Sequence, residues 1–137
     1  MYIYKCTLDD TRQLAILNKK LIEDEKHDNP MNTDELAKRM QEFISGDYNA
    51  YFYKADNNVI GYALVRISST PKYLRQFFIC REYRRKGCGK SFFTELMKEL
   101  GEKALDIEVL SWNKTGIKFW ESMGFLPRSI YMRYHEN

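Results

Sequence analysis

Apolar residues recur at helical spacing in two stretches of the first half of the chain. Three leucines between residues 14 and 21 lie three or four positions apart, which predicts a helix that starts near Thr7 and ends at the acidic run 23–25. A second helix is predicted to open after Asn32, because Glu35 stands three positions later, as in a capping box. The apolar residues that follow share one face, so both helices are expected to pack on a common core.

Runs rich in aromatic and β-branched residues predict the strands. Residues 48–55 (YNAYFYKA) and 59–67 flank an Asp-Asn-Asn turn and are expected to pair as a hairpin. The second half adds three strands and two helices, in the order strand 73–80, helix from Gly87, strand 104–110, helix 113–123 and strand 125–134. A strand–helix–strand unit predicts parallel pairing, whereas a hairpin is antiparallel. The fold class is therefore α/β, with a mixed central sheet flanked by helices, and residues 1–137 are expected to form a single domain.

The composition favours a folded, reduced protein. Hydrophobic residues make up 44% of the chain and aromatic residues 15%, which argues against disorder. No run approaches the roughly 20 apolar residues of a membrane-spanning helix, and the first ten residues lack the apolar core of a secretory signal. The three cysteines (Cys6, Cys80 and Cys88) are scattered and have no histidine nearby, so neither a zinc site nor a disulfide framework is expected. A cytoplasmic protein with no metal and no membrane partner is the simplest interpretation.

Positive charge is concentrated in one place. The net charge is only +3, yet five of the ten residues in 81–90 (REYRRKGCGK) are basic. A general nucleic-acid surface needs a wider basic footprint, so nucleic acid is not the expected partner. The cluster instead suggests a site for a compact anion.

The segment RRKGCGKS, residues 84–91, resembles two known phosphate motifs but satisfies neither. A P-loop needs a glycine five positions before Gly89, and that position is Arg84. The dinucleotide fingerprint needs a third glycine where Phe92 stands. It also needs an acidic residue at a strand end about 20 residues later, whereas Asp106 falls inside a predicted strand.

A third pattern, Arg-x-x-Gly-x-Gly between a strand and a helix, fits residues 84–89 without a gap. Two glycines allow the backbone to approach an anion closely, and the first N–H groups of the helix point towards it. The helix dipole and the neighbouring cations add positive potential. An ordinary basic turn with two glycines would show the same six residues, so the pattern alone does not decide the function.

The surrounding sequence resembles the GNAT superfamily of N-acetyltransferases in three segments. Residues 79–89 are similar to its V-x-P-E-Y-R-G-K-G-I-G segment, with Arg81 in place of proline and Arg85 in place of glycine. Residues 113–125 resemble its N-x-x-A-x-x-F-Y-x-x-x-G-F segment, and residues 59–63 resemble the V-V-G-Y-A strand that precedes both. The three segments occur in the family's order and cover about half of the chain. The resemblance implies a GNAT-like fold with splayed central parallel strands.

The resemblance also implies acetyl-CoA as co-substrate and a set of residues that bind it. The loop and helix start would hold the pyrophosphate, the strand before the loop would pair with the pantetheine arm, and Asn113 with two aromatic residues would lie near the thiol end. The implied positions are Phe77, Ile79, Arg81, Arg84, Arg85, Lys86, Gly87, Cys88, Gly89, Lys90, Asn113, Phe119 and Trp120. Asn113 is equally well placed to cap the helix that follows it, and Cys88 is expected mainly to pack.

The acid–base residues do not follow from the resemblance. Many members have a tyrosine acid at the position of Trp120, and some have a glutamate base in the strand that here spans 73–80, which contains no carboxylate. The remaining catalytic candidates are Glu25 and His27 near the end of the first helix and Glu108 on a later strand. His27 is expected to act as a local hydrogen-bonding group rather than as a catalyst.

The sequence thus predicts an N-acetyltransferase that acetylates a primary amine, and it leaves room for a homodimer. The acidic run 23–25 would suit a cationic acceptor at the end of the first helix, although a solvated helix end explains the same residues. Two other interpretations stay open. One is a non-catalytic acyl-CoA-binding module, suggested by Trp120, and the other is a basic nucleic-acid binder using residues 81–90.

Overall fold

A computed structural model describes all residues from 1 to 137. Its five strands form one sheet in the order β1-β2-β3-β4-β5, with bounds β1 Tyr2–Lys5, β2 Tyr48–Ala55, β3 Asn58–Arg66, β4 Lys72–Ile79 and β5 Leu105–Ile107. The first four strands pair antiparallel and β5 pairs parallel to β4, which confirms the mixed α/β sheet. The helices are α1 Thr11–Asp24, α2 Thr33–Ser45, α3 Cys88–Leu100 and α4 Lys114–Ser122, with short 3-10 helices η1 at Leu8–Asp10 and η2 at Arg81–Tyr83.

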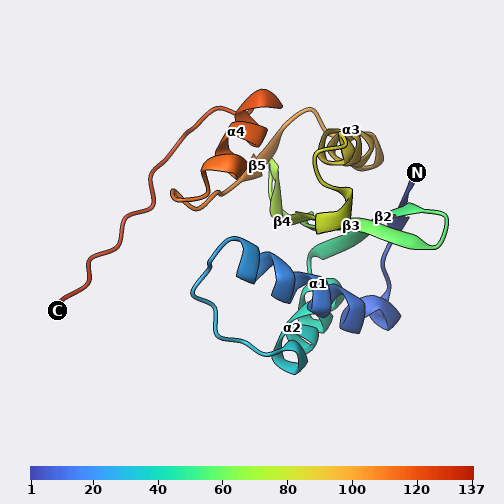
Figure 1. The fold of residues 1–137 in the computed structure, drawn as a ribbon, viewed down its shortest axis with the longest axis horizontal. Coiled ribbons are helices and arrows are strands. Elements are labelled where there is room, and N and C mark those ends of the chain that lie inside the picture. Colours follow the sequence, from blue (N-terminus) through green and yellow to red (C-terminus); the bar gives the residue numbers. More distant parts are fainter.

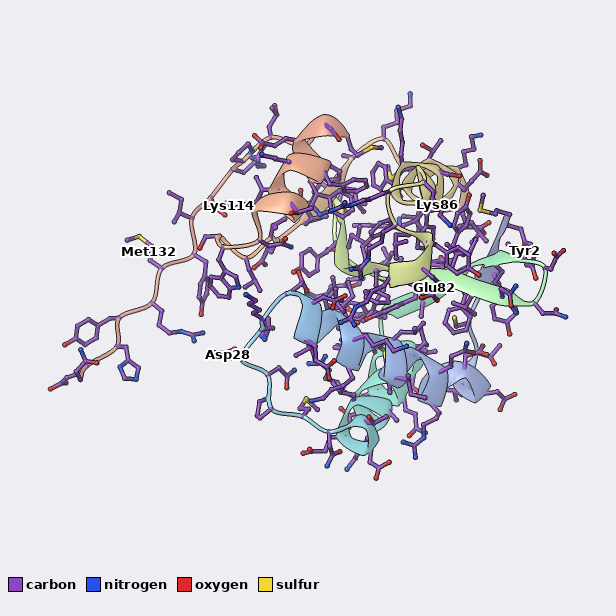
Figure 2. The ribbon with its side chains drawn as sticks, viewed as in Figure 1. Tyr2, Asp28, Glu82, Lys86, Lys114 and Met132 are labelled. Carbon is purple, nitrogen blue, oxygen red and sulfur yellow. The ribbon has the colours of Figure 1, made fainter.

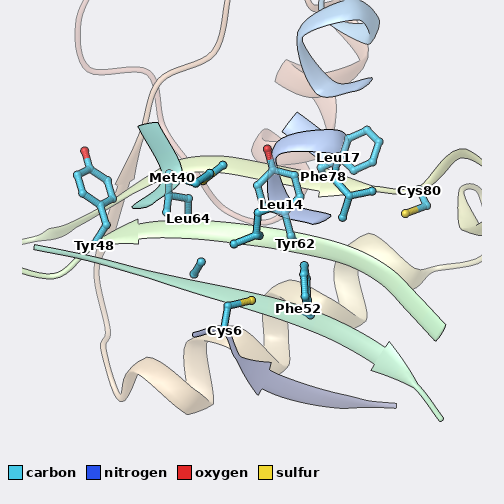
Figure 3. Packing of buried hydrophobic residues seen from close by; sticks show 11 residues of the cluster. Cys6, Leu14, Leu17, Met40, Tyr48, Phe52, Tyr62, Leu64, Phe78 and Cys80 are labelled. Atoms are coloured by element: carbon cyan, nitrogen blue, oxygen red, sulfur yellow. The ribbon is translucent and has the colours of Figure 1, made fainter. Parts of the chain in front are cut away.

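The helices cover the sheet on both faces, with α1 and α2 on one side and α3 and α4 on the other (Figure 1). Alternate residues of the central strands therefore enter two separate cores. On β2, Ala50 and Phe52 join the α1–α2 core seen in Figure 3, whereas Tyr51 and Tyr53 join the core beneath α3. Because both faces are buried, β2 and β3 read as nearly continuous apolar runs.

Two capping boxes form, one at the helix start predicted near Thr7 and one at Asn32, where the sequence predicts it. Thr7 with Asp10 caps η1, which runs directly into α1. The Asn32 side chain accepts a hydrogen bond from the Glu35 N–H at 2.9 Å, and a Glu35 oxygen accepts one from the Asn32 N–H at 3.0 Å. These reciprocal bonds satisfy two of the backbone donors that a helix start leaves open.

The end of α4 forms a Schellman motif. Gly124 adopts a left-handed backbone with φ +97°, the Phe125 N–H bonds to the Trp120 carbonyl, and the Gly124 N–H bonds to the Glu121 carbonyl. The Phe125 and Trp120 rings then lie 5.2 Å apart. This contact fixes the point at which the chain leaves α4.

The observed strands differ from the predicted ones in three places. β1 is an additional strand that was not predicted, and its four residues pair with the edge of β2. The strand predicted at 125–134 is absent: every residue from Leu126 onwards is exposed and outside any helix or strand. Its β-forming composition does not suffice, because a strand needs an edge to pair with. The strand predicted at 104–110 is also shorter, since β5 ends at Ile107.

None of the helices is both long enough and apolar enough to cross a bilayer.

Candidate functional site

The two parallel strands separate halfway along β4. Their register runs from Lys72↔Leu105 to Leu74↔Ile107 and stops there, although β4 continues to Ile79. Next to the last parallel pair, β4 has a bulge on its other side, where it pairs with β3. Leu64 of β3 pairs with Gln76 and Val65 pairs with Leu74, so Arg75 of β4 has no partner. A bulge bends its strand and increases the local twist. The bulge accounts for the splay that the resemblance implied. The parallel pair itself lies at the edge of the sheet and not at its centre, because no strand pairs with the outer side of β5.

The turn from β4 into α3 leaves an unusual number of backbone donors free. None of the six N–H groups from Arg85 to Lys90 donates to a backbone carbonyl, and the first that does is Ser91, to Gly87. An ordinary helix start leaves about four donors without a partner. Six consecutive donors at the positive end of a helix dipole provide a binding surface for a phosphate-like anion.

Each glycine of this turn has its own structural reason. Gly87 has φ +77°, the left-handed region that favours glycine, and nothing would crowd a Cβ there. Gly89 instead needs its small size, since a Cβ would come within 3.1 Å of the Phe119 ring. Arg85 also lies in the left-handed region, at φ +61°. A non-glycine residue there costs about 1–2 kcal/mol, a strain that proteins tend to keep at ligand sites.

Two basic residues of the loop, Arg81 and Arg84, form ion pairs with Asp24 at the end of α1. Arg81 Nε lies 3.1 Å from one oxygen of Asp24, and an Arg84 nitrogen lies 2.6 Å from the other. Arg84 Nε also donates to the Ile79 carbonyl at 2.8 Å. The remaining cations of the loop, Arg85, Lys86 and Lys90, form no ion pair. Figure 2 shows Lys86 beside the start of α3. Because Arg85, Lys86 and Lys90 have no acidic partner, they supply the free positive charge of the loop.

The ion pairs of Asp24 with Arg81 and Arg84 should stabilise the fold in a pH-dependent way. Burial alone would raise the pKa of Asp24, but the hydrogen bonds from Arg81 and Arg84 outweigh it and lower the pKa. A lowered carboxyl pKa contributes stability above the unfolded pKa of about 3.9 and loses it as the pH falls through the folded value. Asp24→Asn is expected to destabilise the protein by about 1 kcal/mol at pH 7, a modest amount because water screens the exposed guanidinium groups.

Urea unfolding of the wild type and Asp24→Asn at neutral and acidic pH would measure this effect. The difference in unfolding free energy should narrow as the pH falls below about 4, where aspartate becomes protonated. A difference that stays constant across this range would show that the charge of Asp24 is not what stabilises the contact.

Glu25 and Asn113 meet where the end of α1 faces the start of α4. The Asn113 side chain accepts from the Gly116 N–H at 3.0 Å, which confirms its capping role, and its Nδ2 lies 3.4 Å from Glu25 Oε2. The Trp112 indole N–H donates to the Glu25 main-chain carbonyl at 2.9 Å. These residues line an open hollow of about 330 Å³. Loops far apart in sequence thus hold one carboxylate in place.

Burial raises the pKa of Glu25, and the charge of Asp24 acts in the same direction. The charge of His27 and the hydrogen bond from Asn113 lower it by less. A half-buried carboxylate with a raised pKa is a stronger base than an exposed one, which suits proton transfer. His27 itself lies on the exposed turn after α1, where its Nδ1 accepts from the Asn29 N–H at 3.1 Å.

Glu108, the other carboxylate considered from the sequence, lies in a different place. It lines a second open hollow, of about 400 Å³, together with Asp106, Tyr48, Tyr73 and other residues. There, burial and the charge of Glu108 raise the pKa of Tyr73 to about 12. The structure therefore brings Glu25, and not Glu108, beside Asn113.

The remaining predicted positions form an aromatic cluster between β4, α3 and α4. The Phe77 ring lies 5.1 Å from Trp120 and 6.2 Å from Phe119, and Phe119 and Trp120 are 4.8 Å apart. Ile79 packs against the same core, and Cys88 is buried within it, as its packing role predicts. These side chains fix α4 against the turn that contains Gly89.

Comparison with known proteins decides the family. Residues 8–129 match the family model of the acetyltransferase (GNAT) domain. The chain belongs to the GNAT acetyltransferase family. Acetyl-CoA is the acyl donor that membership of this family implies.

Solved GNAT structures share the fold over nearly the whole chain. A possible acetyltransferase from Clostridium difficile superimposes with a TM-score of 0.78 at 19% identity, covering 98% of this chain and 96% of that one. AAC(6')-Iy, in complex with a CoA-containing bisubstrate analogue, superimposes with a TM-score of 0.75 at 17% identity, covering 98% and 97%. At this level of identity the likeness concerns the fold alone.

Two curated relatives match this chain over only part of their own length. An L-ornithine N5-acetyltransferase, NATA1, from Arabidopsis thaliana is 38% identical over 55 residues, which is 38% of this chain. The chain spans only about a third or less of the curated relatives it matches, 35% and 24% of their lengths. Their activities as whole proteins are therefore not transferred directly.

Two residues at this candidate site were not singled out from the sequence. Trp112 was not considered, although it directly precedes Asn113 and its indole is 56% exposed without a core role. Asp24 was considered only as part of an acidic rim, whereas both of its oxygens are occupied by arginines from the loop after β4. An acidic residue at a helix end and a basic loop both appear in the sequence, but only the tertiary structure pairs them.

Proposed function

We propose that this GNAT chain transfers an acetyl group from acetyl-CoA to a primary amine. The observation that carries the proposal is the run of six free N–H groups from Arg85 to Lys90, which follows the splay between β4 and β5. Glu25 and Asn113 lie together between the end of α1 and the start of α4. An anion-binding turn and a basic carboxylate are the two elements that this reaction needs.

The residues present fit a CoA pyrophosphate. The backbone of 85–90 would donate the hydrogen bonds, Gly89 would keep α4 close to the turn, and Arg85, Lys86 and Lys90 would add charge. The unpaired edge of β4 at Phe77 and Ile79 would face the pantetheine arm. Arg81 and Arg84 would act indirectly, by holding the turn against Asp24.

When bound, acetyl-CoA supplies an acetyl thioester whose carbonyl accepts the amine nitrogen and whose sulfur leaves as the thiolate. The chain must first deprotonate the amine. An alkylammonium with a pKa of about 10.4 is roughly 3.4 units from its nucleophilic form at pH 7, or about 4.6 kcal/mol. Glu25 would accept this proton, directly or through a water, because its pKa is raised and Asn113 fixes one of its oxygens.

Trp120 would have no acid role in this mechanism. An indole N–H is a hydrogen-bond donor that does not ionise in the physiological range, and the ring is held by its aromatic neighbours. Trp120→Phe, which keeps an aromatic ring, is therefore expected to keep kcat within about threefold of wild type, far less than the 10²–10⁴-fold that an acid–base residue contributes. A hundredfold loss of kcat in a variant with a normal circular-dichroism melting curve would contradict this assignment.

The acidic residues at the end of α1 and the substrates of similar proteins both favour one class of acceptor amine. The proteins that this chain resembles include an ornithine acetyltransferase and an aminoglycoside acetyltransferase in complex with sisomicin. With Asp24 neutralised by two arginines, Glu23 and Glu25 are the acids left at the end of α1. We therefore expect a small acceptor with further positive charge to suit these two acids better than an acceptor without it.

Thiol release from acetyl-CoA in the presence of an amine panel tests the proposal. The panel should include diamines, basic amino acids, aminoglycosides and a lysine peptide. Steady amine-dependent release of thiol is the expected result. Tight binding of acetyl-CoA without turnover across the panel would overturn it in favour of a non-catalytic acyl-CoA-binding module, the alternative that Trp120 suggests.

A further inference from the structure

Two arginines on the α1–α2 side of the sheet have no acidic partner. Arg39 extends from α2 and Arg75 from the bulge of β4, and neither forms an ion pair. The guanidinium carbon of Arg39 lies 5.4 Å from the centre of the Phe43 ring, and that of Arg75 lies 5.0 Å from it. An aromatic ring attracts a cation but does not cancel its charge. Two guanidinium groups are therefore held beside one ring without a counter-ion.

Arg39 is half-buried and its hydrogen bonds are incomplete. One of its terminal nitrogens donates to Asn18 Oδ1 at 3.1 Å, and Asn18 itself is only 1% exposed. The Nε of Arg39 is buried and has no hydrogen-bond partner. Burial lowers the pKa of Arg39, and the charge of Arg75 lowers it further. Because buried donors are nearly always paired in proteins, an unpaired one beside a second cation points to a missing anion.

The side chain of Arg75 is reached from an open hollow. Arg75 donates to the Tyr48 hydroxyl at 3.3 Å, and both residues line the hollow of about 400 Å³. Ser69, whose buried Oγ has no hydrogen-bond partner, lines the same hollow. Asp106 and Glu108 line it as well, but neither forms an ion pair with Arg75. The hollow therefore gives a ligand access to this arginine from solvent.

Polar side chains connect the two arginines to Glu25. The Tyr62 hydroxyl donates to Gln76 Oε1 of β4 at 2.8 Å. Figure 3 shows the hydroxyl ends of Tyr48 and Tyr62 on the same face of the sheet. Burial raises the pKa of Tyr62 most, the charge of Glu25 raises it further, and the charge of Arg39 lowers it. Tyr62 thus lies within reach of the charges of both Glu25 and Arg39.

The spacing along α1 indicates how long a ligand must be to reach both groups. Asn18, the partner of Arg39, and Glu25 at the helix end are seven residues apart, which is about 10 Å along a helix axis. The α-amine of an amino acid lies directly beside its own carboxylate. The terminal amine of lysine or ornithine lies several bonds farther away and therefore suits this distance better.

We propose that Arg39 and Arg75 bind a carboxylate of the acceptor, and that the acceptor is an amino acid with a side-chain amine. A guanidinium group forms paired hydrogen bonds with a carboxylate, which would also supply the partner that the Nε of Arg39 lacks. The side-chain amine then lies towards Glu25. This inference rests on the acetyl-transfer proposal and adds the class of acceptor to it.

Lysine and lysinamide are matched acceptors that test the carboxylate. They share the side-chain amine, but lysinamide has a neutral amide in place of the carboxylate. In the wild type, kcat/KM for lysine should exceed that for lysinamide roughly tenfold or more, the scale of a charge-assisted hydrogen bond. Equal values for the two acceptors would overturn the proposal, and so would acetylation of the α-amine of lysine in the product.

The arginine variants test which residues read the carboxylate. Arg75→Gln and Arg39→Gln should each bring the ratio of the two kcat/KM values close to one. Arg75 is exposed, so its variant provides the test even if Arg39→Gln folds poorly. Arg66 is the matched control, because it lines the same hollow but its Nε is paired with Asp47 at 3.0 Å. Arg66→Gln should keep the wild-type ratio, and an equal loss in Arg66→Gln and Arg75→Gln would overturn the assignment.

A binding measurement separates this inference from the acetyl-transfer proposal. In NMR spectra of the arginine Nε–H groups, lysine should shift the signal that disappears in Arg39→Gln, and lysinamide should leave it in place. If lysine shifts this signal while no amine releases thiol from acetyl-CoA, the carboxylate site stands and the acetyl-transfer proposal falls. If amines are acetylated but lysine leaves the signal unmoved, the carboxylate site alone is wrong.

Discussion

Glu25→Gln is expected to lower kcat/KM for the amine by about 10²–10⁴-fold, the usual contribution of a general base. The amide keeps the shape of the side chain and its contact with Asn113, but it cannot accept a proton. Binding of acetyl-CoA should be unchanged, because the loop at 85–90 does not contact Glu25 in the structure. The loss should therefore appear in turnover and not in the dissociation constant for acetyl-CoA.

The stability of Glu25→Gln distinguishes a loss of catalysis from a loss of folded protein. Because burial raises the pKa of Glu25, ionising this carboxyl group costs more free energy in the folded chain than in the unfolded chain. A raised carboxyl pKa adds stability below the unfolded value of about 4.3 and loses it as the pH rises through the folded value. Glu25→Gln should therefore be at least as stable as wild type at pH 7, while losing activity.

The pH profile gives a further check on Glu25. In the wild type, kcat/KM should fall on the acid side as Glu25 becomes protonated, with an apparent pKa above that of an ordinary glutamate. Glu108→Gln, in the other hollow, is the control and should stay close to wild type. If Glu108→Gln instead showed the larger loss, the assignment of the base would be wrong.

Gly87→Ala is expected to weaken acetyl-CoA binding about tenfold or more, since each charge-assisted hydrogen bond lost costs about 1.5–3 kcal/mol. Alanine is strained at φ +77°, so the turn would relax and redirect the N–H groups that surround it. The variant should also lose about 1–2 kcal/mol of stability, the cost of a left-handed non-glycine residue.

Gly101 provides a matched control at the other end of the same helix. It ends α3 with φ +66° and, like Gly87, has no atom within 4 Å of a built Cβ. Gly101→Ala should therefore cost similar stability and leave acetyl-CoA binding unchanged. Isothermal titration calorimetry of both variants measures the comparison. Equal dissociation constants for the two would show that the backbone of the Gly87 turn does not bind the cofactor.

Local signals in the sequence were sufficient for most of the fold. The Asn32–Glu35 capping box, the hairpin about residues 56–58 and the Gly124 helix end each depend on a few neighbouring residues, and the structure forms all three. The 125–134 strand failed for the opposite reason. Its composition is local, but its partner is not, and the same holds for β1, whose four residues become a strand only beside β2.

The candidate site shows the same distinction between local requirements and contacts between distant segments. The two glycines follow from their spacing, because a tight turn is a local requirement. Asn113 follows from the family resemblance, and its capping role follows from its position before the helix. The choice between Glu25 and Glu108, and the engagement of Arg81 and Arg84 by Asp24, depend on which loops meet in space. No spacing within one segment encodes a contact between residues 24 and 84, so the sequence alone left those roles open.

Amide NMR of the uniformly labelled chain tests the central claim, that the turn from Arg85 to Lys90 binds the pyrophosphate of acetyl-CoA. At 16.4 kDa the protein suits the method. Titration with acetyl-CoA should shift the amide protons of Gly87, Gly89 and their neighbours more than any other group. Acetyl-pantetheine, which lacks the pyrophosphate, should leave them unmoved. If acetyl-CoA bound while these amides stayed in place, the account of the site would be contradicted.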